Sequence, residues 1–479
     1  MKKTSPADGK TNPTAISFLS IPQALILSVV SVAAFHLAFW NGSWSFLILV
    51  FLFCLFRLCN LKTGWLAFAF GMGIGLAIYV PYLSFFWKLF GAGAMALWLV
   101  LPAWLGVFLV LIRRCLMEWG IFGLAVSAPF VWTGLEYFRS ELYYFRFPWL
   151  ASGYAFANAG ELEYAAVYGV YGIGFLFLAA ASLFLILPLV NKRTRIFFLI
   201  VLGVGTLYPA IEKSGARPAP GKTVHVAGVQ IPVGRDESAV KALDELVKKS
   251  PDAELIVLQE CLFRGGVPEP VLQWCKDHKK YLIAGGWDRM DEKKFYNTAY
   301  VVDTDGKIVF RQAKCRPVQF CNDGIPARDQ KLWKSPWGLI GIAICYDDGY
   351  RVVMDELVRQ GAQMLIVPTM DPPAWGELEH EIHSRIVRMR AAEYEMPVLR
   401  VSGAGPSVFA GRDGLVKALA PSGMDFAVID GKMEMASHGR LPPDRWVTGI
   451  AVVVTAAFAS WFVALTVVRW RVKRKLAGK

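Results

Sequence analysis

Apolar stretches long enough to cross a lipid bilayer constrain the fold of this chain more than any other feature. A membrane-spanning helix needs about 20 mostly apolar residues. The pattern predicts a multi-span α-helical membrane bundle, with seven spans in residues 22–213 and an eighth at 446–468. The seven earlier stretches lie at roughly 22–41, 43–59, 64–87, 89–112, 119–138, 164–190 and 195–211.

Residues 213–445, between the seventh and eighth stretches, have the composition of a water-soluble protein. Over the whole chain 55% of residues are hydrophobic and 19% are charged. In an average soluble protein about 45–50% of residues are apolar and about 25% are charged. Because the apolar excess is confined to the predicted spans, the chain must occupy two environments, bilayer and water.

The net charge of +13 arises from Lys and Arg residues that cluster beside alternate apolar stretches, such as Arg113, Arg114 and Lys192. The positive-inside rule places such segments in the cytoplasm. We therefore expect cytoplasmic tails at 1–21 and 469–479, with the soluble region on the opposite side of the membrane. This charge distribution needs no polyanionic partner, so no nucleic acid is expected.

The eight cysteines show no CxxC pair and no Cys/His spacing of the kind that holds zinc. We therefore expect neither a metal nor a cofactor. Some cysteines fall in the soluble region, which is predicted to lie outside the cytoplasm. Disulfides are possible there, and the sequence leaves open whether any form.

Strand and helix patterns alternate over residues 222–432, which predicts an α/β domain. Residues 297–314 read as a hairpin with an Asp-Gly turn. Amphipathic periodicity predicts helices at 236–249, 354–361 and 376–395. Short apolar runs predict strands at 224–231, 254–260, 281–287, 338–347, 363–369, 398–403 and 407–414.

Three polar residues stand at the predicted ends of strands: Glu260, Lys314 and Cys345. Taken singly, a strand-end Glu or Lys is usually solvated, and a Cys in an apolar run usually packs in the core. Together at the rim of a sheet they can perform thiol acyl transfer. Cys345 would be the nucleophile, Glu260 the general base and acid, and Lys314 the cation that stabilises thiolate and oxyanion.

The segments LIVLQE and GIAICYD, with the lysine between them, resemble the Glu-Lys-Cys signatures of the nitrilase superfamily. The membrane part resembles one branch of it, the apolipoprotein N-acyltransferase family. Residues in the membrane part and in the soluble region carry that likeness, among them Trp132, Glu136, Arg139, Phe147, Pro148, Trp149, Gly153, Tyr154, Trp375, Gly376, His380, Arg390, Glu393 and Arg400.

This resemblance implies a nitrilase-like αββα sandwich and a specific reaction. A fatty acyl chain would pass from a phospholipid to a thioester on Cys345, and then to the N-terminal amine of diacylglyceryl-cysteine in apolipoproteins. The implied partners are a phospholipid donor, an apolipoprotein acceptor and the membrane. The implied location is the bacterial inner membrane, with the catalytic domain on the periplasmic side. The resemblance also implies supporting or substrate-binding roles for Asp323, Tyr346, Asp347, Trp149 and Trp375.

The loop after Lys314 departs from the family pattern. By ungapped counting, the family's second essential glutamate falls on Asn322, which cannot carry a charge, and Asp323 is next to it. A carboxylate there would keep Lys314 protonated. Alternatively, Asp323 would only form a turn with Gly324, which is a common use of the Asp-Gly pair.

Three other functions fit the same sequence. A membrane-bound amidase would use the same three residues, with water in place of the amine. An acyltransferase could act on a different membrane amine. A non-catalytic scaffold with a relic domain is the third, and the presence of all three central residues disfavours it.

Overall fold

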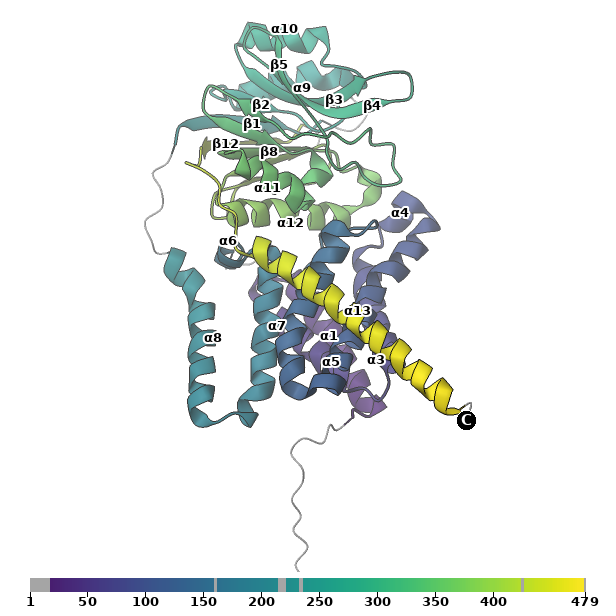
Figure 1. The fold of residues 1–479 in the computed structure, drawn as a ribbon. Coiled ribbons are helices and arrows are strands. Elements are labelled where there is room, and N and C mark those ends of the chain that lie inside the picture. Colours follow the sequence, from purple (N-terminus) through teal and green to yellow (C-terminus); the bar gives the residue numbers. More distant parts are fainter. Residues whose placement is uncertain (1–17, 159–161, 214–220, 232–235, 424–425, 478–479) are drawn as a thin grey trace, which may run out of the picture.

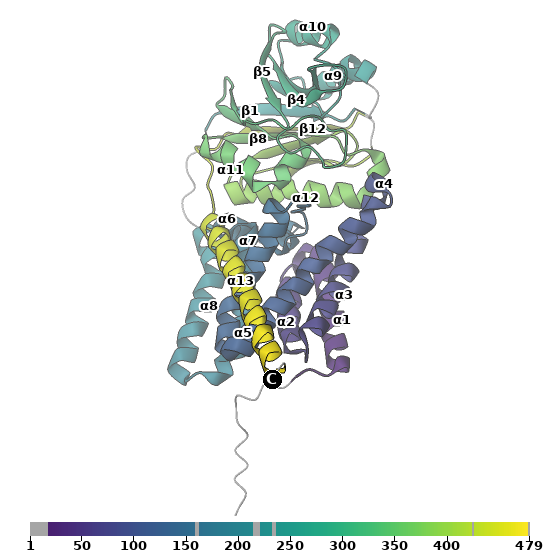
Figure 2. The ribbon, with the colours of Figure 1, turned by 45° about the vertical axis from the view of Figure 1, so that its right-hand side comes forward.

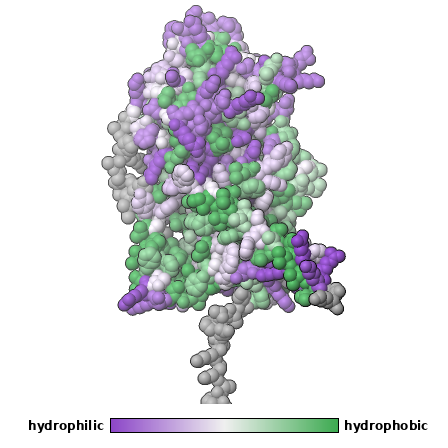
Figure 3. All heavy atoms as spheres, in the orientation of Figure 1, coloured by the Kyte–Doolittle hydropathy of each residue, from purple (hydrophilic) through white to green (hydrophobic). Residues whose placement is uncertain are grey.

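The computed structural model describes residues 18–158, 162–213, 221–231, 236–423 and 426–477. Most of the predicted N-terminal tail, and residues 214–220 between the seventh predicted span and the α/β domain, lie outside the described residues. The described part has a helical bundle on one side and an α/β domain on the other (Figures 1 and 2). Apolar side chains gather on the surface of the bundle, and hydrophilic ones on the α/β domain (Figure 3).

The bundle contains five helical segments that are long and apolar enough to cross a membrane, by length and composition, within the described residues. Leu47–Asn60 is a shorter apolar segment. The helices are α1 (Ile21–Trp40), α2 (Leu47–Arg57), α3 (Gly64–Tyr82), α4 (Phe86–Phe90), α5 (Gly93–Tyr137), α6 (Glu163–Tyr168), α7 (Val170–Ile186), α8 (Lys192–Lys213) and α13 (Asp444–Ala477).

Helix α5 is two halves joined by a sharp break at Gly120, where φ is 68° and ψ is −167°. Near the break, Arg113 donates a hydrogen bond to the carbonyl of Leu61 at 2.8 Å, beside the start of α3. Arg469, near the end of α13, pairs with Glu118 at 2.6 Å. The break therefore lies at the end of the bundle remote from the α/β domain.

Both ends of α5 lie instead beside the α/β domain. The ring of Phe90, just before α5, contacts that of Phe320, and Glu141, just after it, accepts a hydrogen bond from the backbone of Arg351. The two halves of α5 thus run in opposite directions, as expected of separate stretches at 89–112 and 119–138. The predicted stretch 164–190 instead forms two helices that meet at Gly169, where φ is 73°. The total of eight crossings stays a prediction.

The α/β domain contains two six-stranded sheets. The first has the order β12-β1-β2-β3-β4-β5, and the second β11-β10-β9-β8-β7-β6. In each, the three strands that pair in parallel are flanked by antiparallel ones. The strands are β1 (Thr223–Val229), β2 (Leu255–Val257), β3 (Tyr281–Arg289), β4 (Phe295–Val302), β5 (Ile308–Ala313), β6 (Leu332–Lys334), β7 (Leu339–Ile342), β8 (Met364–Thr369), β9 (Val398–Ser402), β10 (Ser407–Ala410), β11 (Val416–Ala420) and β12 (Val428–Glu434).

The two sheets pack face to face, and one apolar core contains residues of both, such as Leu255 and Ile366. Helices α9 (Ala239–Lys249) and α10 (Glu269–His278) cover the outer face of the first sheet, with Leu243 and Trp274 in a second core. Helices α11 (Arg351–Arg359) and α12 (Glu377–Tyr394) cover the second sheet (Figure 1). The predicted αββα sandwich is confirmed.

Helix α12 lies between the second sheet and the bundle (Figures 1 and 2). Its residues Val387 and Ala391 belong to the core of the α/β domain, whereas Ile386 and Met389 belong to the core of the bundle. A helix with two buried faces cannot shift without opening one of the cores. It therefore fixes the α/β domain against the membrane part.

Three predicted strands, at 254–260, 338–347 and 407–414, end early in the structure. The predicted strand 254–260 ends at Val257. The chain leaves the sheet there and turns at Cys261, whose φ is 51°. The predicted strand 338–347 ends at Ile342, because the chain then enters the helical turn Cys345–Gly349. The predicted strand 407–414 ends at Ala410. Strand β12 continues to Glu434, past the predicted domain end at 432, because it pairs with the full length of β1.

Candidate active site

The structure brings Glu260, Lys314 and Cys345 together at one rim of the two sheets. Lys314 follows β5 directly, Glu260 follows the short β2, and Cys345 follows β7. The ammonium of Lys314 donates a hydrogen bond to Glu260 Oε1 at 2.8 Å. Each of the three is at most 2% exposed. Their interactions therefore act at the reduced dielectric of a buried site.

The backbone of Cys345 is in the left-handed region, with φ at 49°. It begins a short helical turn, Cys345–Gly349, and Asp347 within that turn accepts a hydrogen bond from the backbone of Ile344 at 3.2 Å. Non-glycine residues in this conformation are uncommon, and they gather at functional sites where the surrounding structure holds them. The turn presents the Cys345 thiol at the rim of the sheet.

Asp323, and not Asn322, contacts the lysine. Its Oδ2 accepts a hydrogen bond from Lys314 Nζ at 2.7 Å, while Asn322 is exposed. The side-chain amide of Asn297 donates to both Glu260 and Asp323, at 2.7 and 2.8 Å. One ammonium thus lies between two carboxylates. Asp323 also precedes Gly324, whose φ of 86° suits a turn, so the turn and the ion pair occur together.

Charge and burial set the protonation of the central pair. Burial lowers the pKa of Lys314, but the neighbouring Asp323, Cys345 and Glu260 raise it more, so its pKa lies well above the ordinary value. Burial and the charge of Glu260 raise the pKa of the Cys345 thiol well above its usual range, against the opposing effect of Lys314. The resting site therefore holds a charged lysine and a neutral thiol, which needs a base before it can attack.

Asp347 positions the site rather than contacting Lys314. Its carboxylate accepts hydrogen bonds from the backbone of Cys315 and Arg316, at 3.1 and 2.6 Å, in addition to Ile344. It thus ties the segment after Lys314 to the turn that carries the nucleophile. Burial raises the pKa of Asp347 to about 7.

The thiol opens into an apolar pocket of about 630 Å³, mouth included. Its walls come from both parts of the molecule: the region of α4 and the start of α5, the loop after α5, and the α/β domain. Trp149, Tyr346 and Trp375, all predicted to support the site or to bind substrate, line it with Phe147. The pocket therefore joins the nucleophile to the membrane part.

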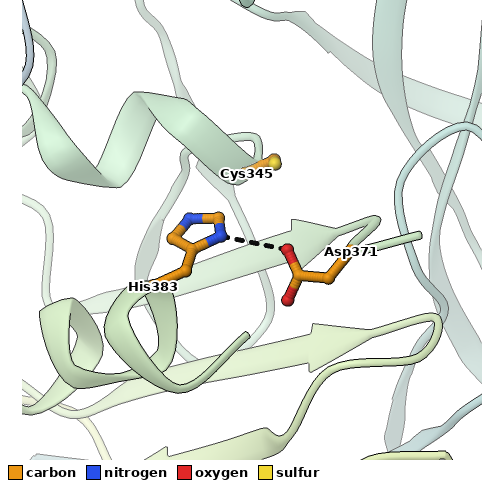
Figure 4. A group of neighbouring side chains, drawn as sticks. All are labelled: Cys345, Asp371 and His383. Atoms are coloured by element: carbon orange, nitrogen blue, oxygen red, sulfur yellow. Dashed lines mark hydrogen bonds and ion pairs between the residues drawn. The ribbon is translucent and has the colours of Figure 1, made fainter. Parts of the chain in front are cut away.

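Sequence reasoning missed a second group beside the nucleophile. Single ligand atoms of Cys345, Asp371 and His383 lie within 4.8 Å of one another, and Figure 4 shows the His383 ring and the Asp371 carboxylate below the thiol. His383 Nδ1 lies 3.0 Å from Asp371 Oδ1. Arg400 binds the other oxygen of Asp371, so the group is an ion-pair network and not a ready cation site.

The charged residues of this network set the protonation state of His383. Burial disfavours the His383 imidazolium, but Asp371 and Asp348 outweigh it and raise the pKa of His383 to about 10. The His383 ring stacks on Trp149, with centroids 4.5 Å apart. A signal existed in the sequence, because His383 lies one turn after His380, the histidine singled out by the family resemblance. Periodicity alone could not tell which of the two faces Cys345.

Two family models match the chain. "Apolipoprotein N-acyltransferase N-terminal domain" matches residues 27–183, and "Carbon-nitrogen hydrolase" matches residues 226–430. A solved structure, Saccharomyces cerevisiae Nit3 of the nitrilase superfamily, is 22% identical with a TM-score of 0.39, covering 46% of this chain and 93% of that one.

Bacterial relatives span both regions. The apolipoprotein N-acyltransferase of Aquifex aeolicus is 27% identical over 63% of this chain and 75% of the relative. That of Geobacter metallireducens is 23% identical over 84% of this chain and 88% of the relative. With its apolar helices, the chain is a bacterial inner-membrane protein. It belongs to the apolipoprotein N-acyltransferase family of the nitrilase superfamily and is an acyltransferase of lipoprotein biosynthesis.

Proposed function

We propose that Cys345 carries a fatty acyl chain from a phospholipid to the N-terminal amine of a diacylglyceryl-cysteine in an apolipoprotein, on the periplasmic side of the membrane. The apolar pocket carries this proposal, because it leads from the buried Cys345 thiol to the membrane bundle. The Lys314–Glu260 pair acts electrostatically on that thiol. Both substrates have tails that stay in the bilayer. An enzyme fixed at the interface gains proximity to them without spending binding energy.

The first half-reaction loads the enzyme. Glu260 takes the proton of the Cys345 thiol as the sulfur attacks the ester carbonyl of the phospholipid. The Lys314 ammonium stabilises the oxyanion of the tetrahedral intermediate. The carbon–oxygen bond then breaks, and Glu260 returns the proton to the leaving oxygen. The products are a lysophospholipid and a thioester on Cys345.

The second half-reaction unloads the enzyme. The neutral amine of the acceptor attacks the thioester carbonyl, and Glu260 takes a proton from its nitrogen. The carbon–sulfur bond breaks, and the proton passes to the Cys345 sulfur. An amide forms and the free thiol is restored. Purified protein mixed with phospholipid alone should therefore show an acyl adduct on Cys345 by intact mass, and an acceptor peptide should discharge it to an amide.

The walls of the pocket should decide how well long acyl chains are used. We expect the double variant Phe147→Ala and Trp149→Ala to lower the rate with long-chain phospholipids by at least about tenfold, because each ring loses roughly 1.5–3 kcal/mol of apolar burial. Short water-soluble thioesters should be affected little. Tyr144→Ala is the matched control, since Tyr144 is in the same loop and 64% exposed. Equal losses on both donors would contradict an acyl-binding role.

The proposed orientation also has a direct test. A reporter active only in the periplasm, fused after Ser437 beyond β12, should be active. The same reporter fused after Lys475, at the end of α13, should be silent. The basic residues beside alternate spans predict this result. The reverse pattern would place the catalytic domain in the cytoplasm.

A further inference from the structure

Glu379 is a buried carboxylate that the two half-reactions do not use. It lies in the first turn of α12 and is fully buried. It lines the same pocket as Cys345. Neither of its carboxylate oxygens has a hydrogen-bond partner among the described residues. A buried polar group without a partner is costly, and it often marks a place where a ligand belongs.

The position at a helix start does not explain this burial. An acidic residue in the first turn does stabilise the helix macrodipole. Glu377, in the same turn of α12, is exposed and can provide that interaction from water. The interaction with the macrodipole therefore does not explain why Glu379 is buried in the pocket.

The surrounding charges leave room for one more cation. Three buried carboxylates, Asp348, Asp371 and Glu379, meet two buried cations, His383 and Arg400. Asp371 is bound by both cations, and Asp348 lies 3.4 Å from His383 Nε2. Glu379 Oε1 is 3.7 Å from His383 Nδ1, too far for a hydrogen bond. Of the three carboxylates, Glu379 therefore has the weakest contact with the two cations.

Two further basic groups approach the first turn of α12. His380 Nε2 lies 3.8 Å from Glu379 Oε2, but it is 3.1 Å from the carbonyl of Pro372, which is the closer contact. From α4, the exposed Lys88 reaches the backbone at Gly376. Neither donates a hydrogen bond to Glu379, so its oxygens stay available to a cation that enters the pocket.

We propose that Glu379 binds the ammonium group of the acceptor and takes its first proton. This inference rests on the proposed function, which requires an amine to attack beside Cys345. An α-amine has an ordinary pKa of about 8 and arrives mostly as an ammonium, which has no lone pair for attack.

The protons balance with two bases. The ammonium gives one proton to the Glu379 carboxylate, which leaves a neutral amine and a carboxylic acid. The nitrogen then forms its bond to the thioester carbonyl, the carbon–sulfur bond breaks, and the second proton reaches the sulfur through Glu260. Glu379 finally releases its proton to water. Burial, and then Asp371, raise the pKa of Glu379 well above the ordinary value, and the positive charge of an entering ammonium favours the carboxylate form that accepts its proton.

A single-turnover experiment separates the half-reactions. Wild type, Glu379→Gln and the control Glu377→Gln are loaded with phospholipid in the absence of acceptor, and the adduct on Cys345 is measured by intact mass. A diacylglyceryl-cysteine peptide is then added, and loss of the adduct is followed. Glutamine is isosteric with a protonated glutamate, so the pocket should keep its shape. Glu377→Gln changes the charge of the same helix turn outside the pocket.

We expect Glu379→Gln to load within about threefold of the wild-type rate and to discharge to the peptide about a hundredfold more slowly, the lower end for general acid–base catalysis. Hydroxylamine, which is uncharged at neutral pH, should discharge both proteins at similar rates. Glu377→Gln should match wild type throughout.

Several results would overturn the inference. They are wild-type discharge of Glu379→Gln to the peptide, an equal slowing with hydroxylamine, or failure of Glu379→Gln to load. Failure of the wild type itself to form an adduct would instead refute the proposed function.

Discussion

Replacing Cys345 by alanine should remove the acyl adduct and lower lipoprotein acylation by about four orders of magnitude or more, because the thiol proposed to form the thioester is gone. The side chain is small, and the positive φ at this position is equally accessible to alanine. The variant should therefore fold, and its thermal unfolding should stay close to that of the wild type. Intact mass after incubation with phospholipid measures the adduct.

The matched control is Cys321→Ala, which alters an exposed cysteine in the segment after Lys314. It should keep both the adduct and the activity. Turnover by Cys345→Ala at a wild-type rate would rule out the thioester mechanism. An adduct that persists in Cys345→Ala would show that another residue is acylated.

The change Asp323→Asn should slow the enzyme by about a hundredfold, or about 2.7 kcal/mol in activation free energy. Asp323 is the neighbour that raises the pKa of Lys314 most, and asparagine carries no charge. Once Glu260 has taken the thiol proton, Asp323 is the carboxylate that still holds the ammonium in place. Asparagine keeps the turn preference before Gly324, so a loss of rate would report the charge and not the turn.

Single-turnover loading of Cys345 measures this effect without the second substrate. Asp329→Asn is the control, because Asp329 is an exposed carboxylate in the same segment. It should load normally. If Asp323→Asn loaded within a factor of a few of wild type, Asp323 would be a turn residue only, and Lys314 would depend on Glu260 alone.

The membrane bundle and the α/β class were predictable because their signals are local. The length of an apolar stretch and the period of a strand or helix depend only on neighbouring residues. Glu260, Lys314 and Cys345 were also predictable, since strand ends in one domain converge on the rim of the sheet. The reversal at Gly120 could be expected from the two apolar stretches on either side of it.

The sequence by itself thus determined which segments are apolar enough to cross a membrane, which fold as a sandwich, and which three residues meet at the rim of its sheets. Only the tertiary structure decided that Asp323, rather than Asn322, contacts Lys314. The two residues are adjacent in the loop, and the conformation of the loop decides which side chain points toward the ammonium. The tertiary structure also decided that His383 and Glu379 lie beside Cys345. These residues are on α12, whose rotation is set by packing against a sheet on one face and the bundle on the other, and such packing leaves no signature in local sequence.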